Sequence, residues 1–326
     1  MHRTVKLQVG ILAAIGLLLL PLPLLHGTST IINFLVYALI FLILAESFNF
    51  LTGYAGQISL GSAAFFGIGA YTLTVSLTWY KVPPIPSLLV AGAVPAVLSV
   101  LVALPLFRLK QDVFAIGTLG FALILQIIVL YQNSLGGPSG LSIVGVAYNI
   151  NLDYYIDLIS AVLIVIAIVL LLNSKFGFGL VSIREDEDVA ESLGIPVLKY
   201  KVLAFALSSL FAGIAGGVYA LYVFHVSSDL LGITWTVNAM VICIIGGGGT
   251  VMGPAVMSLI FVWLQNYLLV SYPVVDTFIY AILLIVVVVF LPDGLMTLYR
   301  MTVTKQPRKP GLLEKEMLGL RKDERK

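Results

Sequence analysis

The sequence predicts an all-α membrane protein that crosses the bilayer about ten times. Of its 326 residues, 60% are hydrophobic and only 10% are charged, and the mean hydropathy is +1.07. A soluble protein of this size needs far more polar side chains to cover its surface. The apolar residues gather in runs of about 20, which is the length that a helix needs to cross a bilayer. Two glycine-rich breaks within these runs are the third observation, and they suggest that the spans form two repeats.

The candidate spans follow one another with short connections, and they form one predicted transmembrane domain over residues 1–300. Residues 301–326 are predicted to form a charged cytoplasmic tail. The first span also fits a signal peptide, but no A-x-A-like cleavage site follows it, so we expect a retained helix. The spans are residues 8–25, 31–51, 62–80, 87–107, 113–132, 155–173, 201–223, 234–246, 252–270 and 275–291.

The positions of the basic residues predict the orientation of the chain. If both termini, the connection with Arg108 and Lys110, and the segment of residues 175–201 are cytoplasmic, every one of the 18 Lys and Arg residues except Lys81 lies on the inner side. Cytoplasmic loops of membrane proteins carry such an excess of Lys and Arg. We therefore expect both termini inside and a turn-rich loop around residues 133–141 outside, with room for a partner-binding surface or a plug.

Residues 53–61 and 246–254 interrupt the apolar runs with glycine at matching places in the two halves. Superposing Gly53 on Gly246 also pairs Gly56 with Gly249. Broken backbone in a membrane must be buried in protein or line a wet cavity, and paired breaks are typical of transporters with two repeats. Close packing of helices through small residues is the alternative. The candidate pathway residues are Gly53, Gly56, Gln57, Ser59, Gly61, Ser62, Gly246, Gly249 and Thr250, with Thr72 and Asn238 nearby.

Residues 175–201 form the only long hydrophilic interruption between spans, and a helix is predicted over about residues 184–194. Acidic residues open this helix, as the positive end of a helix favours, and Gly194 followed by Pro196 ends it. The apolar side of such a surface helix needs a protein partner, or else it lies against lipid headgroups. The expected contact residues are Arg184, Glu185, Asp188, Val189, Ala190, Leu193 and Gly194, with Val189, Ala190 and Leu193 on one side.

Few residues of the chain are candidates for catalysis, proton transfer or metal binding. Glu46 is the one acidic residue placed well inside a predicted span, which makes it a functional candidate, unless it lies close enough to the cytoplasmic end to reach water. Cys243 is expected to be a small buried residue. The glycines of residues 246–249 lack the following Gly-Lys-Ser/Thr of a phosphate-binding loop. We expect no catalytic residue, no metal site, no cofactor and no nucleic-acid partner.

Four segments together resemble the LivM-type permease family of branched-chain amino acid ABC importers. They are residues 52–71 (TGYAGQISLGSAAFFGIGAY), 136–141 (GGPSGL), 183–220 and 246–254 (GGGGTVMGP). The resemblance covers about residues 30–295 and implies the all-helical fold of type II importer permeases in a prokaryotic inner membrane. It also implies a LivH-like second permease, two cytoplasmic LivG/LivF-like ATPases that bind ATP and Mg²⁺, and an extracytoplasmic substrate-binding protein.

Permeases of this kind carry a cytoplasmic loop of the pattern Glu-Ala-Ala, three residues and then Gly, which docks on the ATPase. The spacing from Asp188 to Gly194 matches this pattern, with Asp in place of Glu and Val189 in place of Ala. The resemblance therefore implies that this helix is the ATPase-docking element. The substrate remains open among branched-chain amino acids, urea, short amides, sugars and nucleosides. A secondary transporter is an alternative, but apart from Glu46 the spans offer almost no carboxylate for ion coupling. A passive channel or a scaffold is a further alternative, and the resemblance together with the cytoplasmic helix favours the ABC importer over both.

Overall fold

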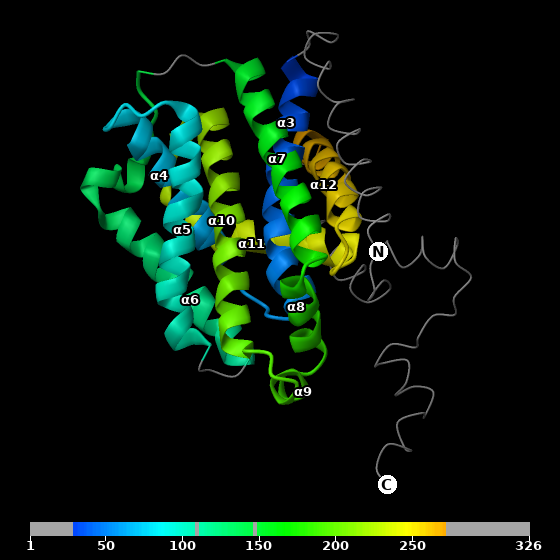
Figure 1. Cartoon of the computed structure of the whole chain (residues 1–326). Coiled ribbons are helices and arrows are strands. Elements are labelled where there is room, and N and C mark those ends of the chain that lie inside the picture. Colours follow the sequence, from blue (N-terminus) through cyan, green and yellow to red (C-terminus); the bar gives the residue numbers. More distant parts are fainter. Residues whose placement is uncertain (1–28, 108–110, 146–148, 272–326) are drawn as a thin grey trace.

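The computed structural model describes residues 29–107, 111–145 and 149–271, and within them eight of the expected spans are helices (Figure 1). By length and composition, five of these helices can cross a membrane, and the other three are apolar but shorter. The first and tenth expected spans and the tail lie outside the described residues. The helices are α3 (Ser29–Asn49), α4 (Ser62–Thr78), α5 (Pro84–Leu106), α6 (Gln111–Tyr131), α7 (Ile150–Leu172), α10 (Val197–Val223), α11 (Ile233–Gly246) and α12 (Met252–Ser271).

Short elements connect these helices. Two of them, α8 (Lys175–Glu185) and α9 (Glu187–Ser192), form the hydrophilic connection between α7 and α10. The others are the π-helix η1 (Phe50–Tyr54), the 3₁₀ helices η2 (Asn133–Leu135), η3 (Gly137–Ser139) and η4 (Ser228–Leu231), and the two-residue strands β1 (Leu141–Ser142) and β2 (His225–Val226). The all-α prediction is thus confirmed apart from one short strand pair.

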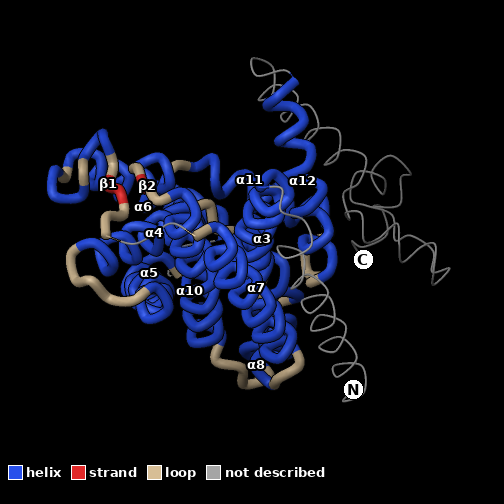
Figure 2. Tube along the Cα trace, turned by 90° about the horizontal axis from the view of Figure 1, so that it is seen from above, coloured by secondary structure: helices blue, strands red, loops and turns tan. Residues whose placement is uncertain are grey.

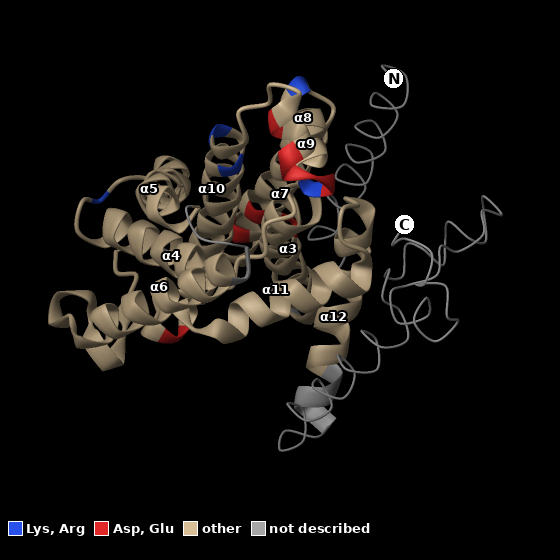
Figure 3. Ribbon diagram, turned by 90° about the horizontal axis from the view of Figure 1, so that it is seen from below, with Lys and Arg blue, Asp and Glu red and all other residues tan. Residues whose placement is uncertain are grey.

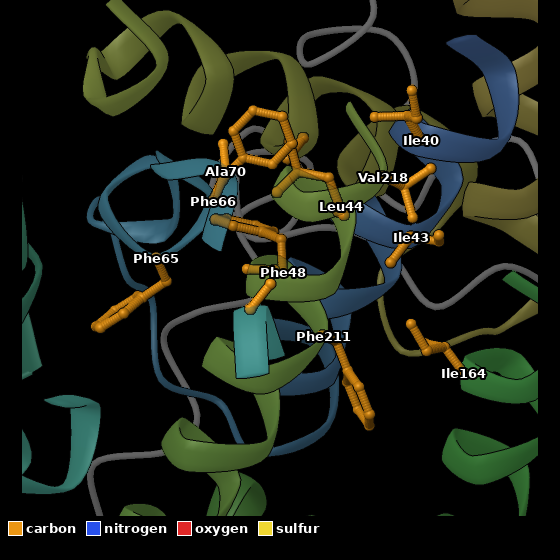
Figure 4. Packing of buried hydrophobic residues seen from close by; sticks show 14 of the residues in the cluster. Ile40, Ile43, Leu44, Phe48, Phe65, Phe66, Ala70, Ile164, Phe211 and Val218 are labelled. Atoms are coloured by element: carbon orange, nitrogen blue, oxygen red, sulfur yellow. The ribbon is translucent and has the colours of Figure 1, made fainter. Parts of the chain in front are cut away.

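Helix α10 is at the centre of the fold and packs against α3, α4 and α5. Glycines of α10 and α4 allow close approach: a Cβ atom on Gly216 of α10 would lie 1.8 Å from the carbonyl oxygen of Phe66, and one on Gly69 of α4 would lie 2.1 Å from that of Gly213. Small residues at helix contacts are typical of membrane proteins, where packing rather than water drives association. Around this contact, side chains of α3, α4, α7 and α10 meet in one apolar cluster (Figure 4).

The two ends of α10 define the two ends of the molecule. Its first residues follow α9, and its last residues lead into β2, about 40 Å away at 1.5 Å per residue. Strand β2 pairs antiparallel with β1, beside α4 and α6 (Figure 2). Most charged residues of the described part of the chain are in α8, α9 and the start of α10 (Figure 3). The described residues therefore have a charged end, formed by α8 and α9, and a strand end.

The loop around residues 133–141 forms the turns that its sequence predicts. Gly136 and Gly140 have φ of +85° and +70°, which side chains other than glycine rarely adopt. A Cβ atom on Gly140 would lie 2.3 Å from the carbonyl oxygen of Val226, so this loop is held against the segment that follows α10.

Helix α7 begins at Ile150, five residues before the expected start at residue 155, because the side-chain Oδ1 of Asn149 caps it by accepting the N–H groups of Asn151 and Leu152. Asp153, which precedes the expected span, therefore lies in the first turn of α7. The structure also corrects the expectation that Glu46 is the one acidic residue well inside a span, because Asp157 of α7 is fully buried too.

Candidate functional site at the junction of the two glycine breaks

The first break follows α3 directly and is confirmed. After Asn49 the chain forms the π-helix η1, then runs without regular structure to Gly61. Its polar groups find partners inside the protein: the N–H of Leu60 donates to Oγ1 of Thr118 at 3.0 Å, and the N–H of Ala63, in the first turn of α4, donates to Oγ1 of Thr236 at 2.9 Å. These backbone groups of the break are thus paired within the protein, as the low polarity of a membrane requires.

The second break, between α11 and α12, is also confirmed and shares one conformational feature with the first. Gly56 and Gly249, which the superposition of the two halves pairs, both have left-handed φ, +72° and +78°. The helices that follow the two breaks do not start at equivalent positions. The superposition pairs Ser62, the first residue of α4, with residue 255, but α12 already begins at Met252. The repeat is therefore closest at the breaks themselves.

Asn49 joins the two breaks. Its Nδ2 donates to the carbonyl oxygen of Thr250 at 2.8 Å and to Oε2 of Glu46 at 3.1 Å, and its Oδ1 accepts the N–H of Gly249 at 2.8 Å. A Cβ atom on Gly53 would lie 2.4 Å from the backbone nitrogen of Gly249, so the two breaks touch through their backbones. We call Asn49, Gly53, Gly249 and Thr250 the glycine junction.

The expected single helix over residues 184–194 is wrong in its boundaries, because the chain forms two helices there. Asp186 adopts an extended conformation between them, and its Oδ1 accepts the N–H of Val189 at 3.0 Å, as an N-cap residue does. Arg184 and Glu185 therefore belong to the last turn of α8 and not to α9. The predicted end is confirmed: Gly194 has φ of +83°, and its N–H donates to the carbonyl oxygen of Glu191.

The apolar residues of α9 do not share one side, which corrects a second expectation. Ala190 is 1% exposed and faces the protein, whereas Val189 and Leu193 are 55% and 73% exposed. Asp188 and Gly194 are also exposed. Helix α9 thus presents two large apolar side chains to its surroundings and packs on the protein through a small one.

Charged and polar side chains fasten α8 and α9 to the first break and to α10. Nη1 of Arg184 donates to the carbonyl oxygen of Gly53 at 2.7 Å, and Nε2 of Gln57 donates to Oε1 of Glu187 at 3.2 Å. The same Glu187 oxygen forms an ion pair with Lys201, which is 9% exposed at the start of α10. The sequence interpretation missed Glu187 and Lys201, because the two residues are on different helices and only the fold brings them together.

Residues 30–288 match the family described as the permease component of the branched-chain amino acid transport system. The chain belongs to this family. It is 27% identical to the high-affinity branched-chain amino acid transport permease LivM of Salmonella typhimurium, over 80% of this chain and 69% of that relative. It is 26% identical to LivM of Escherichia coli, over 91% and 76%. It is also 28% identical to the guanosine ABC transporter permease NupQ of Bacillus subtilis, over 51% and 59%. No solved structure matches.

The chain is thus a permease subunit of an ABC importer. In this permease, the candidate pathway residues lie in a closely packed region. Gln57, Ser59 and Ser62 are buried, and a Cβ atom on Gly61 would lie 2.6 Å from the carbonyl oxygen of Thr118. A Cβ atom on Gly246 would lie 2.5 Å from the backbone of Gly253. The structure brings Gly53, Gln57, Gly249 and Thr250 to the junction region beside α8 and α9, whereas Thr72 and Asn238 lie about 15 and 12 Å along α4 and α11 from the breaks.

Two buried acidic residues of the permease stand out. Glu46 is fully buried, so the alternative in which its carboxylate reaches water is wrong for this structure. Its Oε2 accepts from Asn49, and its Oε1 has no hydrogen-bond partner in the described segments. Asp157 is also fully buried, and neither of its carboxylate oxygens has a partner among the described residues. Cys243 is buried as expected, with its sulfur 3.6 Å from Oδ1 of Asn49.

Proposed function

We propose that this permease moves branched-chain amino acids inward, driven by ATP that partner subunits bind with Mg²⁺ and hydrolyse. In this proposal it pairs with a second, LivH-like permease, two cytoplasmic LivG/LivF-like ATPases and an extracytoplasmic substrate-binding protein. Both termini and the α8–α9 helix pair lie on the cytoplasmic side of the inner membrane. The family description and the names of the two LivM relatives support the substrate class.

The observation that carries the ATPase partnership is the exposure of α9. Val189 and Leu193 are 55% and 73% exposed on a helix that is otherwise rich in charge, at the charged end of the molecule. Charged residues surround them, which fits an aqueous phase better than the lipid interior, and in water two large exposed apolar side chains favour a protein contact. The spacing of residues 188–194 supports the same role. We infer that Val189 and Leu193 enter an apolar cleft of the ATPase.

The contacts of α8 and α9 give this docking a mechanical consequence. Arg184 holds the carbonyl oxygen of Gly53, and Glu187 binds both Gln57 and Lys201. When ATP binding and hydrolysis move the docked ATPases, α9 moves with them, and these bonds transmit the displacement to the first break and to α10. The permease then alternates between a state open to the outside, which receives substrate from the binding protein, and a state open to the cytoplasm.

Nucleosides are the second candidate substrate class, because NupQ of Bacillus subtilis, a guanosine transporter permease, is as similar in identity as the LivM relatives. Uptake of radiolabelled leucine and guanosine by the complete complex in proteoliposomes separates the two classes. We expect leucine uptake that excess isoleucine and valine inhibit and guanosine does not. Uptake of guanosine but not leucine would show that the substrates are nucleosides, and it would leave the role as an importer permease unchanged.

Co-purification after detergent extraction tests the docking role. The double variant Val189→Asp/Leu193→Asp places two carboxylates in the proposed apolar cleft, which should cost several kcal/mol of binding free energy and release the ATPases. The matched control is Tyr80→Asp/Tyr131→Asp, which adds the same charge at side chains that are 74% and 79% exposed at the other end of α4 and α6. The control should retain the ATPases. Retention by the Val189/Leu193 variant, with transport intact, would refute the docking role.

A further inference from the structure

The side chain of Asn49 is the polar link between the two glycine breaks, and its amide group is fully used. It donates twice, to Thr250 and to Glu46, and its Oδ1 accepts from the N–H of Gly249 and lies within reach of the thiol of Cys243. An asparagine amide offers two N–H donors and one oxygen with two lone pairs, so no hydrogen-bonding capacity remains. Asn49 is also completely buried. A buried amide whose hydrogen-bonding groups are all paired favours one specific arrangement of the segments that it joins.

The contact that Asn49 holds together is small and formed by backbone. Gly53 leaves no room for a side chain, because a Cβ atom there would lie 2.2 Å from Oδ1 of Asn49 and 2.4 Å from the nitrogen of Gly249. Glycines bury little apolar surface, so the hydrophobic effect adds little at this point. At this backbone contact the two breaks are thus held mainly by the hydrogen bonds of Asn49, while α11 and α12 on either side of the second break pack against α3 through apolar side chains such as Ala45 and Ile245.

Arg184 lies where the two breaks meet. Its Nη1 donates to the carbonyl oxygen of Gly53 at 2.7 Å, and it is 3.2 Å from the position that a Cβ atom on Gly249 would take. This residue comes from α8, whereas Asn49 comes from the end of α3. A displacement of α8 therefore acts directly on the glycine junction.

Glu46, which binds Asn49, has a buried carboxylate oxygen beside the closed junction. Its Oε1 is buried and has no hydrogen-bond partner within the part of the chain that the structure describes. A buried polar atom without a partner raises the free energy of the state that buries it. Water that enters on opening can bind this oxygen, and this favours separation of the breaks.

We propose that the glycine junction is the inner gate of the permease, with Asn49 and Arg184 as its positioning residues. In the closed state described here, Asn49 holds the second break against the first. Movement of α8 and α9 shifts Arg184 and Gly53, the bonds of Asn49 to Gly249 and Thr250 break, and the cytoplasmic end opens. This inference rests on the proposed function, because it assigns the charged end to the cytoplasm and the driving motion to docked ATPases.

Cys243 provides a native probe of the gate, because it is the one cysteine of the chain, is 2% exposed and contacts Asn49. The experiment measures the rate at which N-ethylmaleimide modifies Cys243, by mass spectrometry of this chain in the purified complex in lipid. In the wild type we expect protection without nucleotide and labelling about tenfold faster or more while ATP and Mg²⁺ drive the cycle. Equal rates in the two conditions, with the ATPases bound and active, would overturn the gate.

The variant Asn49→Ala should label rapidly without nucleotide, both in the complex and in the isolated permease. Its matched control is Ser47→Ala, which removes a 2.8 Å hydrogen bond from Ser47 Oγ to the carbonyl oxygen of Ser208, also at the end of α3 but outside the junction. The control should label like the wild type. Protection of Cys243 in Asn49→Ala equal to that of the wild type would refute the role of Asn49.

Two further readouts separate gating from loss of structure. The Asn49→Ala complex should elute as one assembled species and hydrolyse ATP, while leucine accumulation driven by that hydrolysis falls about tenfold or more, since an open inner gate leaks. Unchanged accumulation per ATP hydrolysed would also refute the gate. Failure of the ATPases to co-purify with the wild type would refute the proposed function, and labelling of the isolated variants would still decide the role of Asn49.

Discussion

The two glycine breaks have the same local conformation but different connections to the rest of the permease. Gly56 and Gly249 share left-handed φ, yet the first break is bound to α8 and α9 through Arg184 and Gln57, and the second is bound chiefly to α3 through Asn49. The first break is therefore the one that receives motion from the charged end. The second is linked to the first by the hydrogen bonds of Asn49, and it lies between α11 and α12, which pack against α3.

This difference suggests why two similar breaks are useful in one chain. If both breaks were hydrogen-bonded equally to α8 and α9, they would move together and the distance between them would not change. Because the hydrogen bonds of α8 and α9 reach the first break, whereas Asn49 of α3 binds the second, a displacement of α8 changes the distance between the breaks. Substitutions at each break can therefore separate their roles.

The largest effect is expected for Gly53→Ala, at the contact between the breaks. The added Cβ atom meets Oδ1 of Asn49 at 2.2 Å and the backbone nitrogen of Gly249 at 2.4 Å, and the backbone atom cannot turn away as a side chain can. Overpacking of this kind costs about 3 kcal/mol. We expect a lower melting temperature in detergent and rapid labelling of Cys243 without nucleotide.

Gly120→Ala is the matched control for this substitution, because a Cβ atom at Gly120 on α6 meets nothing within 4 Å. Alanine is favoured over glycine inside a helix by about 0.5–1 kcal/mol, so this variant should be as stable as the wild type or slightly more stable. Equal melting temperatures for Gly53→Ala and Gly120→Ala would show that the breaks are not in tight contact.

A smaller effect is expected at the ion pair that fastens α9. Glu187→Gln leaves the charge of Lys201 unpaired with only 11% of its side chain exposed, whereas Lys201→Met leaves Glu187, which is 42% exposed and still accepts from Gln57. Loss of the acid should therefore cost more, about 2 kcal/mol against about 1 kcal/mol for loss of the base. Thermal denaturation of the two single variants and the double variant measures this asymmetry, and the reverse order would mean that Lys201 is not effectively buried.

Sequence patterns predicted the spans and the breaks because these depend on local composition. Runs of about 20 apolar residues and clusters of glycine are visible without knowledge of contacts, and eight spans and both breaks were confirmed. The division into α8 and α9 was missed because it depends on one residue, Asp186, whose side chain caps the second helix instead of continuing the first. A run of acidic residues fits both arrangements.

The partners of Asn49, Arg184 and Lys201 could not be predicted for a different reason. Each bond joins residues from separate elements, such as Asn49 with Gly249 and Thr250, and composition gives no register between helices. Asn49 follows Glu46 by about one helical turn, so the two side chains lie on one face of α3. A polar amide next to a predicted break is the signal that could have found the junction.

The smallest expected difference is between the two left-handed glycines, and it tests the comparison of the breaks most directly. Alanine in this conformation costs about 1–2 kcal/mol at either position. At Gly56 the new Cβ atom also meets Cγ and the Cα atom of Arg184 at 2.8 and 3.1 Å, whereas at Gly249 it meets only the flexible end of that side chain at 3.2 Å and the carbonyl oxygen of Gly53 at 3.2 Å. Gly56→Ala should therefore be less stable than Gly249→Ala by about 1 kcal/mol, measured as melting temperatures in the same detergent.

Since Gly56 is packed against α8 and Gly249 is held by Asn49, Gly56→Ala should also reduce ATP-driven leucine uptake more. Equal losses in both variants would mean that α8 bears on the two breaks alike and that the first break has no special link to the charged end.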